Sequence, residues 1–221
     1  MKKLAIMLSL AGMAATSFGQ GYVSVAADSS TLVNTNSSVD ISGNPVSGGG
    51  SGAIAKGTGA YQFALLTAPF TGTSNSTSLN GSGSSLHGWL FTGLQAANSA
   101  TFAGRFNLGS DVQALNATAG TMNQWMVVGW STSIASTWAA FAPILGAGLQ
   151  GQTGYYGVSG LGTAAAGAAP PATPTSIYGL GNPIGGPFDL NTISPVPEPA
   201  TFALAGLGAA AMLIFRRRSS K

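Results

Sequence analysis

Short runs of alternating hydrophobic and polar residues recur along the chain and predict β-strands. Gly, Ser, Asn and Pro separate these runs and predict turns. The run at 124–130 is aromatic and β-branched without charge, so we expect a central strand that is buried on both faces. We expect further strands at 21–26, near 39–41, and at 60–66, 87–91, 100–106, 154–158 and, as a closing edge strand, 188–190.

One segment has the spacing of a helix rather than a strand. Trp138, Phe141 and Leu145 follow one another at intervals of three and four, which places them on one helix face, and Ser136 is the expected N-cap. The stretch at 69–85 is almost wholly Thr, Gly, Ser and Asn and is expected to be a mobile excursion. Strands at short intervals with Gly-rich turns predict an all-β domain, an antiparallel β-sandwich or jelly-roll.

The first 19 residues are typical of a secretory signal peptide and predict an N-terminal signal helix. Two lysines precede a mostly apolar run at 4–15, and Ser17 and Gly19 supply small residues at the two positions that a signal peptidase reads. We therefore expect the secretion machinery and signal peptidase as partners, with cleavage between Gly19 and Gln20. The exported β-rich domain then occupies 20–190.

A second apolar segment, at 200–215, carries no charge. As a helix that rises about 1.5 Å per residue it covers roughly 24 Å, slightly less than a hydrocarbon core about 30 Å thick. Arg216, Arg217 and Arg218 follow directly, and such a cluster keeps its end of a helix in the cytoplasm. The sequence thus predicts a transmembrane helix at 200–215 and a basic cytoplasmic tail at 216–221.

A linker at 191–199 precedes this helix and contains Val196-Pro197-Glu198-Pro199. Each proline fixes its own φ and keeps the residue before it out of the α region, so Glu198 is expected to be extended. Its carboxylate, from the only glutamate of the chain, is then displayed just outside the membrane. The segment is either a stiff spacer ahead of a plain anchor or a sequence that a processing enzyme recognises.

The order of Pro-Glu-Pro, short apolar helix and arginine cluster resembles the PEP-CTERM sorting signal of Gram-negative bacteria, over residues 196–218. The resemblance implies recognition by exosortase, an integral membrane cysteine transpeptidase that cuts near the Pro-Glu-Pro and supplies the catalytic residues itself. It also implies transient anchoring in the inner membrane and delivery to the cell surface or the extracellular matrix of a biofilm. More loosely, Gln20-Gly21, the strand at 61–65 and Trp130 are similar to small exported PEP-CTERM proteins of unknown function.

Charge is scarce and argues against nucleic-acid binding. Charged residues are 6% of the chain against a usual quarter, so a basic patch has few sources. Between residues 20 and 195, Lys56 and Arg105 stand against four aspartates, which gives a net charge of −2. The domain therefore lacks the cluster of lysines and arginines whose attraction to phosphates dominates nucleic-acid affinity. The chain has no cysteine, which excludes disulfides and a thiolate zinc site.

Candidate catalytic or metal-binding residues are isolated from one another. His87 is the only histidine, and we expect a solvated loop residue rather than a metal ligand. No G-x-S-x-G motif supports a Ser-His-Asp triad. The aspartates form neither a calcium loop nor an evident carboxylate pair for sugar hydrolysis, being scattered at Asp28, Asp40, Asp111 and Asp189. We predict no enzyme activity, no metal and no cofactor.

Three functional hypotheses follow from these observations. The leading one is a non-enzymatic, exported surface or matrix protein that is sorted through its C-terminal signal. The second is an envelope protein that its uncut tail anchors permanently in the membrane. The third is a carbohydrate-binding module with exopolysaccharide as partner, for which exposed tryptophans would stack on sugars, although we expect most of them in the core: Trp89, Trp125, Trp130 and Trp138.

Overall fold

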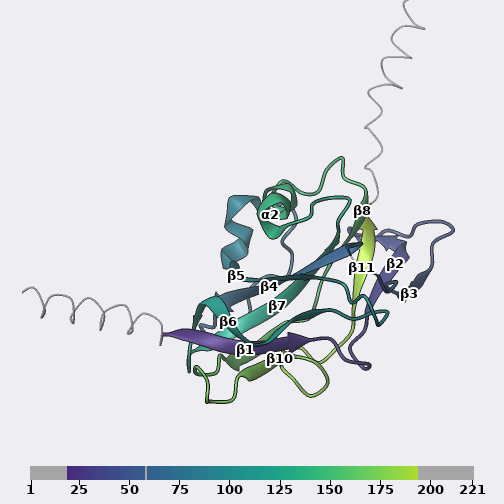
Figure 1. The fold of residues 1–221 in the computed structure, drawn as a ribbon. Coiled ribbons are helices and arrows are strands. Elements are labelled where there is room, and N and C mark those ends of the chain that lie inside the picture. The colour runs from purple at the N-terminus through teal and green to yellow at the C-terminus, as the bar shows by residue number, and fades with distance from the viewer. Residues whose placement is uncertain (1–18, 58, 194–221) are drawn as a thin grey trace, which may run out of the picture.

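The computed structural model describes residues 19–57 and 59–193, in which two β-sheets form a sandwich-like arrangement (Figure 1). This confirms the predicted β-rich class. The smaller sheet has the order β10 (Thr175–Tyr178), β1 (Gln20–Ala26), β6 (Asn107–Thr118). The larger has the order β3 (Ser51–Ala53), β2 (Val33–Asp40), β11 (Phe188–Ile193), β8 (Gly154–Val158), β7 (Met122–Ser131), β4 (Tyr61–Pro69), β5 (Leu90–Ala97), with β9 (Gly162–Ala165) also paired to β7.

Both sheets are mixed, which corrects the predicted purely antiparallel sandwich. β1 pairs with β10 in parallel, and β11 pairs with β2 in parallel, whereas β4, β5, β7, β8 and β9 pair antiparallel. The second parallel pair joins segments that are far apart in the sequence. β11 therefore lies between β2 and β8 in the interior of the large sheet, and the prediction of an edge strand at 188–190 is wrong.

The main core lies between the two sheets and follows from the alternation along β4 and β7. Phe63 and Leu65 of β4 and Trp125 and Val127 of β7 are fully buried against residues of the small sheet such as Val23. Their even-numbered neighbours belong to a second hydrophobic cluster on the opposite face. β7 is therefore buried on both faces, as its uncharged aromatic and β-branched sequence predicts.

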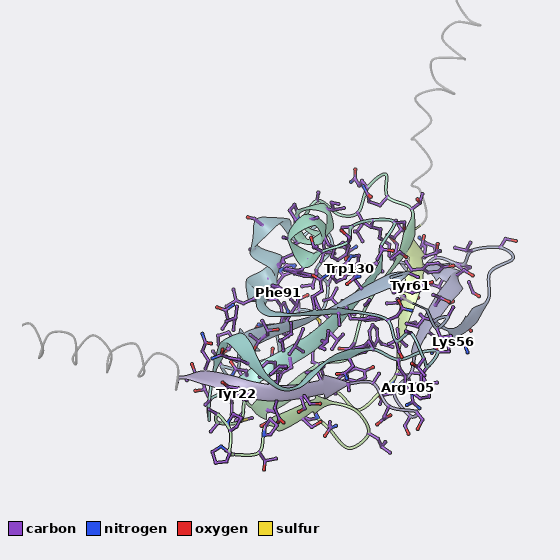
Figure 2. The ribbon with its side chains drawn as sticks, in the orientation of Figure 1. Tyr22, Lys56, Tyr61, Phe91, Arg105 and Trp130 are labelled. Atoms are coloured by element: carbon purple, nitrogen blue, oxygen red, sulfur yellow. The ribbon has the colours of Figure 1, made fainter. Side chains whose placement is uncertain are left out.

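Two helical elements cover that opposite face of the large sheet, namely the 3₁₀ helix η1 (Gly83–Gly88) and α2 (Trp138–Gly146). Figure 1 shows α2 on one side of β4, β5 and β7, with β1 and β10 on the other. Trp138, Phe141 and Leu145 form the buried face of α2, as their spacing predicts. Phe91 and Trp130 lie beneath this helix (Figure 2), and the ring of Trp138 stacks on Phe91 at 5.5 Å between centroids.

The start of α2 is fixed by a cap and by a side chain from the sheet. Thr137 is the N-cap, because its hydroxyl accepts a hydrogen bond from the Ala140 N–H at 3.4 Å, so the prediction of Ser136 as cap is wrong. Gln95 of β5 accepts the Trp138 N–H at 2.6 Å and donates to the Ser136 carbonyl at 3.1 Å. Gln95 thus satisfies a free helix N–H that the sequence alone leaves unassigned.

Three expected strands are misplaced. Residues 100–106 form turns with a single bridge at Phe106, and the long strand β6, which the sequence analysis missed, begins after them. η1 precedes β5 and contains left-handed φ values of 42° at Leu86 and 54° at His87. The strand expected near 39–41 is the end of β2, which starts six residues earlier and runs through polar sequence.

The stretch at 69–85 was expected to be a mobile excursion, but side chains tie it to the large sheet. The indole N–H of Trp89 donates to the Ser76 carbonyl at 2.8 Å. The side-chain oxygen of Gln124 on β7 accepts the Asn75 N–H at 2.8 Å. These contacts fix the loop over the same face that η1 and α2 cover.

Gly157 allows β11 to approach β8 closely. A Cβ at this position would lie 2.0 Å from the carbonyl oxygen of Asp189, a backbone atom that cannot rotate away. We expect Gly157→Ala to lower the free energy of unfolding by about 1–3 kcal/mol, the usual cost of over-packing, as measured by urea denaturation of the purified protein. Gly160→Ala is the matched control, because its Cβ meets nothing within 4 Å. Equal losses in the two variants would contradict the close approach.

Candidate functional site

The last described strand, β11, leads into the predicted sorting segment. Residues 191–193, which the sequence analysis assigned to the linker, are the final residues of β11. The other predicted C-terminal site residues lie outside the described part of the chain: Val196, Pro197, Glu198, Pro199, Arg216, Arg217 and Arg218.

Hydrogen-bonded neighbours hold the end of β11 on both sides. Residues 191–193 pair antiparallel with 154–156 of β8, and the Thr192 carbonyl accepts the Ile41 N–H at 3.0 Å. Ile193, the last described residue, is buried in the second hydrophobic cluster. The sorting segment therefore starts from an interior strand of the large sheet rather than from a loose terminus.

The predicted signal-peptide cleavage point lies at the opposite terminus of the described chain. Gln20 is the first residue of β1 and pairs with Thr118, while the Gly19 carbonyl accepts the Ala119 N–H at 3.2 Å. The expected signal helix and C-terminal helix lie outside the described residues. Across 19–57 and 59–193, no helix has the length and apolar character needed to cross a membrane.

All four tryptophans are buried, so they offer no surface on which a sugar could stack. Three of them donate the indole N–H to backbone carbonyls, at 2.8 Å for Trp89, 3.0 Å for Trp125 and 2.8 Å for Trp130. The fourth, Trp138, packs between Phe91 and Phe141. The expectation that most of the tryptophans serve the core is confirmed.

The structure distributes the aspartates over separate elements and uses two of them to fix turns. Asp28 accepts the Leu180 N–H at 2.9 Å, and this bond is the main cause that lowers the pKa of its carboxyl. Asp40 accepts the Asn44 N–H at 2.8 Å, and its pKa is likewise lowered. Within the described ranges, no three His, Cys, Asp or Glu side chains come together to hold a metal ion, and His87 is exposed.

A polar pocket of about 270 Å³, which the sequence analysis did not anticipate, lies where β8, β11 and the loop at 77–80 meet. Ile41 and Val158 contribute apolar surface to it. Its polar lining comes from Thr77, Ser78, Asn80, Tyr156, Asp189 and Asn191.

Strand register explains why these polar side chains meet. Phe188 and Leu190 of β11 enter the core between the sheets, so Asp189 and Asn191 point to the other face. Asn191 pairs directly with Tyr156 of β8. The alternation along β11 could have revealed its polar face, but no local signal links that strand to the loop at 77–80.

Comparison with known proteins gives one match. A family model for the PEP-CTERM protein-sorting motif matches residues 195–218. No curated protein and no solved structure matches the chain. In this chain a C-terminal sorting motif thus follows a β-rich domain. The match confirms the resemblance to a PEP-CTERM sorting signal seen at 196–218.

The motif has two consequences, one for export of the protein and one for its processing. A PEP-CTERM signal implies that the chain is exported and passes the membrane. It also implies processing by membrane machinery of the exosortase type.

Proposed function

We propose that this chain is an exported surface or extracellular-matrix protein without catalysis of its own, which an exosortase-type transpeptidase processes at its C-terminal tail. The observation that carries the proposal is the sorting motif at 195–218, placed directly after a folded β-rich domain.

The proposed sequence of events begins with secretion and removal of the signal peptide after Gly19. The arginines at 216–218 then keep the tail from passing through the inner membrane, while the apolar segment at 200–215 holds it there. The transpeptidase binds the extended segment at 196–199 and cuts near it. Delivery to the surface or matrix follows the cut.

The length of the connecting chain supports processing close to the membrane. Six residues, 194–199, lie between Ile193 and Ala200, so the seven steps from one residue to the next span at most about 25 Å even when fully extended. The domain is therefore tethered near the headgroups until the tail is cut. Because β11 pairs with a strand on each side, the residue from which the tail starts is held in place when an enzyme binds the tail.

Mass measurement of the protein from its native host tests the proposal. With the cognate exosortase present, we expect chains that begin at Gln20 and end near residues 196–199. Without that enzyme, we expect chains that end at Lys221 and remain in the membrane fraction. Intact mass and C-terminal sequencing distinguish the two forms.

Two results would contradict the proposal. Secreted chains that still end at Lys221 would show that export does not require the cut. Chains that end at Lys221 and stay in the membrane even with the exosortase present would favour the permanently anchored envelope protein instead.

A further inference from the structure

Hydrogen-bonding groups that make no bond to other described residues line the polar pocket at β8, β11 and 77–80. The Tyr156 side chain is only 6% exposed, and its hydroxyl makes no hydrogen bond among the described residues. Because no fully buried side-chain nitrogen or oxygen in that part of the chain lacks a partner, this hydroxyl is accessible to solvent. Burial raises the pKa of Tyr156, so the hydroxyl stays protonated and able to donate at physiological pH. The side-chain amide of Asn191 likewise makes no hydrogen bond within the described part of the chain.

The other polar groups of the pocket are only partly used. Asp189 accepts the Asn34 side-chain N–H with one carboxylate oxygen at 3.2 Å, which leaves its second oxygen free to accept another donor. The Ser78 hydroxyl donates weakly to the side-chain oxygen Oδ1 of Asn80 at 3.4 Å, and the side-chain nitrogen Nδ2 of Asn80 remains available. The pocket therefore presents both donors and acceptors at close range.

The lining excludes several ligand classes. The pocket contains one carboxylate and no cationic side chain, so an anion would meet repulsion without compensation. A single carboxylate is also too little for a calcium site, which needs six to eight oxygens. A wholly apolar ligand would desolvate the hydroxyl and amide groups without replacing their bonds to water, which costs about 1–3 kcal/mol per group.

A neutral polyhydroxyl compound meets every one of these conditions. Its hydroxyls can donate to Asp189 and accept from Tyr156, and its C–H face can pack on Ile41 and Val158. The volume of about 270 Å³ lies just below the roughly 300 Å³ at which sites for drug-sized ligands begin, so it suits a single sugar ring.

We propose that the pocket between β8, β11 and the 77–80 loop is a binding subsite for one residue of a neutral saccharide. Tyr156 and Asp189 supply the central donor and acceptor, and Asn191 adds an amide that serves as either. The subsite works without the tryptophan platform that sugar sites often use. It is independent of where the tail is cut, so it can fail while the proposed sorting stands.

Saturation-transfer NMR and calorimetry on the mature protein from its host test this proposal. The probes are neutral trisaccharides of glucose, galactose and mannose, with trigalacturonic acid as the anionic comparison. We expect saturable binding of at least one neutral probe and none of the anionic one. Tyr156→Phe should weaken binding roughly three- to tenfold, because it removes one hydrogen bond and little volume. Asp189→Asn should weaken it more, because it removes a charged acceptor.

Tyr155→Phe is the matched control. Tyr155 is the next residue on β8 and points to the other face of the sheet, toward Tyr61. Its loss of a hydroxyl should leave saccharide binding unchanged, and thermal unfolding should show that all variants are folded. Failure of every neutral probe to bind, or equal weakening in the 155 and 156 variants, would overturn the proposal.

One further arm separates the saccharide from a segment of the chain itself. The pocket lies beside the last residues of β11, so the six residues at 194–199 are the nearest peptide in sequence. A synthetic peptide of this sequence is added to the same assay. Binding of the peptide that Tyr156→Phe weakens, with no neutral sugar bound, would assign the pocket to the tail and overturn the saccharide proposal.

Discussion

Replacing Trp130 by alanine is expected to lower the free energy of unfolding by about 3–5 kcal/mol. Trp130 is fully buried and stacks on Phe141 with centroids 4.4 Å apart and planes 2° apart. Its indole N–H donates to the Ala135 carbonyl at 2.8 Å. The substitution removes apolar burial, an aromatic stack and a hydrogen bond together, and it leaves a cavity beneath α2. Because small domains are stable by only about 5–15 kcal/mol, this one change removes a large share of the total.

Urea denaturation followed by tryptophan fluorescence and circular dichroism measures this loss. Trp130→Phe should cost less than Trp130→Ala, since it keeps the stack on Phe141 and gives up only the N–H and part of the volume. Phe102→Ala is the matched control for an aromatic truncation, because Phe102 is 55% exposed and contacts Arg105 only at the surface. We expect this control to change stability by no more than about 1 kcal/mol. A Trp130→Ala variant as stable as that control would show that α2 is not held by this stack.

The strands that the sequence predicted well are those in which the local pattern of apolar residues is enough to predict burial. The β4 and β7 segments are apolar on both faces, and β8 is short, aromatic and bounded by glycines, so local pattern suffices. The α2 segment could be recognised for a similar reason, because three large side chains share one helix face. In each case the hydrophobic effect acts on residues that are close in sequence.

The missed strands depend on partners that are far away in the sequence. β2 is almost wholly polar, with only Val33 buried, and its strand conformation is supported by pairing with β3 and β11. β6 has few buried positions and is interrupted by positive φ values at Gly109, Asp111 and Asn116. Such bulged, half-polar strands lack a clear period of two, so their pattern alone does not distinguish them from loops.

The same reasoning explains what could be predicted of the functional sites. The sorting signal is contiguous in the sequence, so its order of proline, apolar run and arginine can be recognised without knowing the fold. The pocket is assembled from the 77–80 loop, β8 and β11, and the antiparallel pairing of β8 with β11 brings its two strands together. A site of that kind has no linear signature, because its geometry is a property of the sheet.

Replacing Glu198 by alanine is expected to slow processing of the tail strongly while leaving export and folding intact. Glu198 lies five residues beyond the last described strand residue, Ile193, and is the only glutamate of the chain. The two flanking prolines restrict it to extended conformations, so its carboxylate is offered to a partner at little entropic cost. Loss of a charge-assisted hydrogen bond worth about 1.5–3 kcal/mol slows a reaction roughly ten- to a hundredfold.

Intact mass of the protein recovered from host membranes and medium measures the effect, as the ratio of chains ending at Lys221 to chains cut near the motif. Glu198→Gln tests whether the enzyme recognises the negative charge of the side chain, because this substitution keeps its shape. Asp189→Asn is the matched control, since it removes a different carboxylate close to the end of β11 and should leave processing unchanged. Processing of Glu198→Ala at the wild-type rate would mean that the enzyme reads the stiff backbone between the prolines. In that case a Pro197→Ala variant, which frees the φ angle before Glu198, should slow the cut instead.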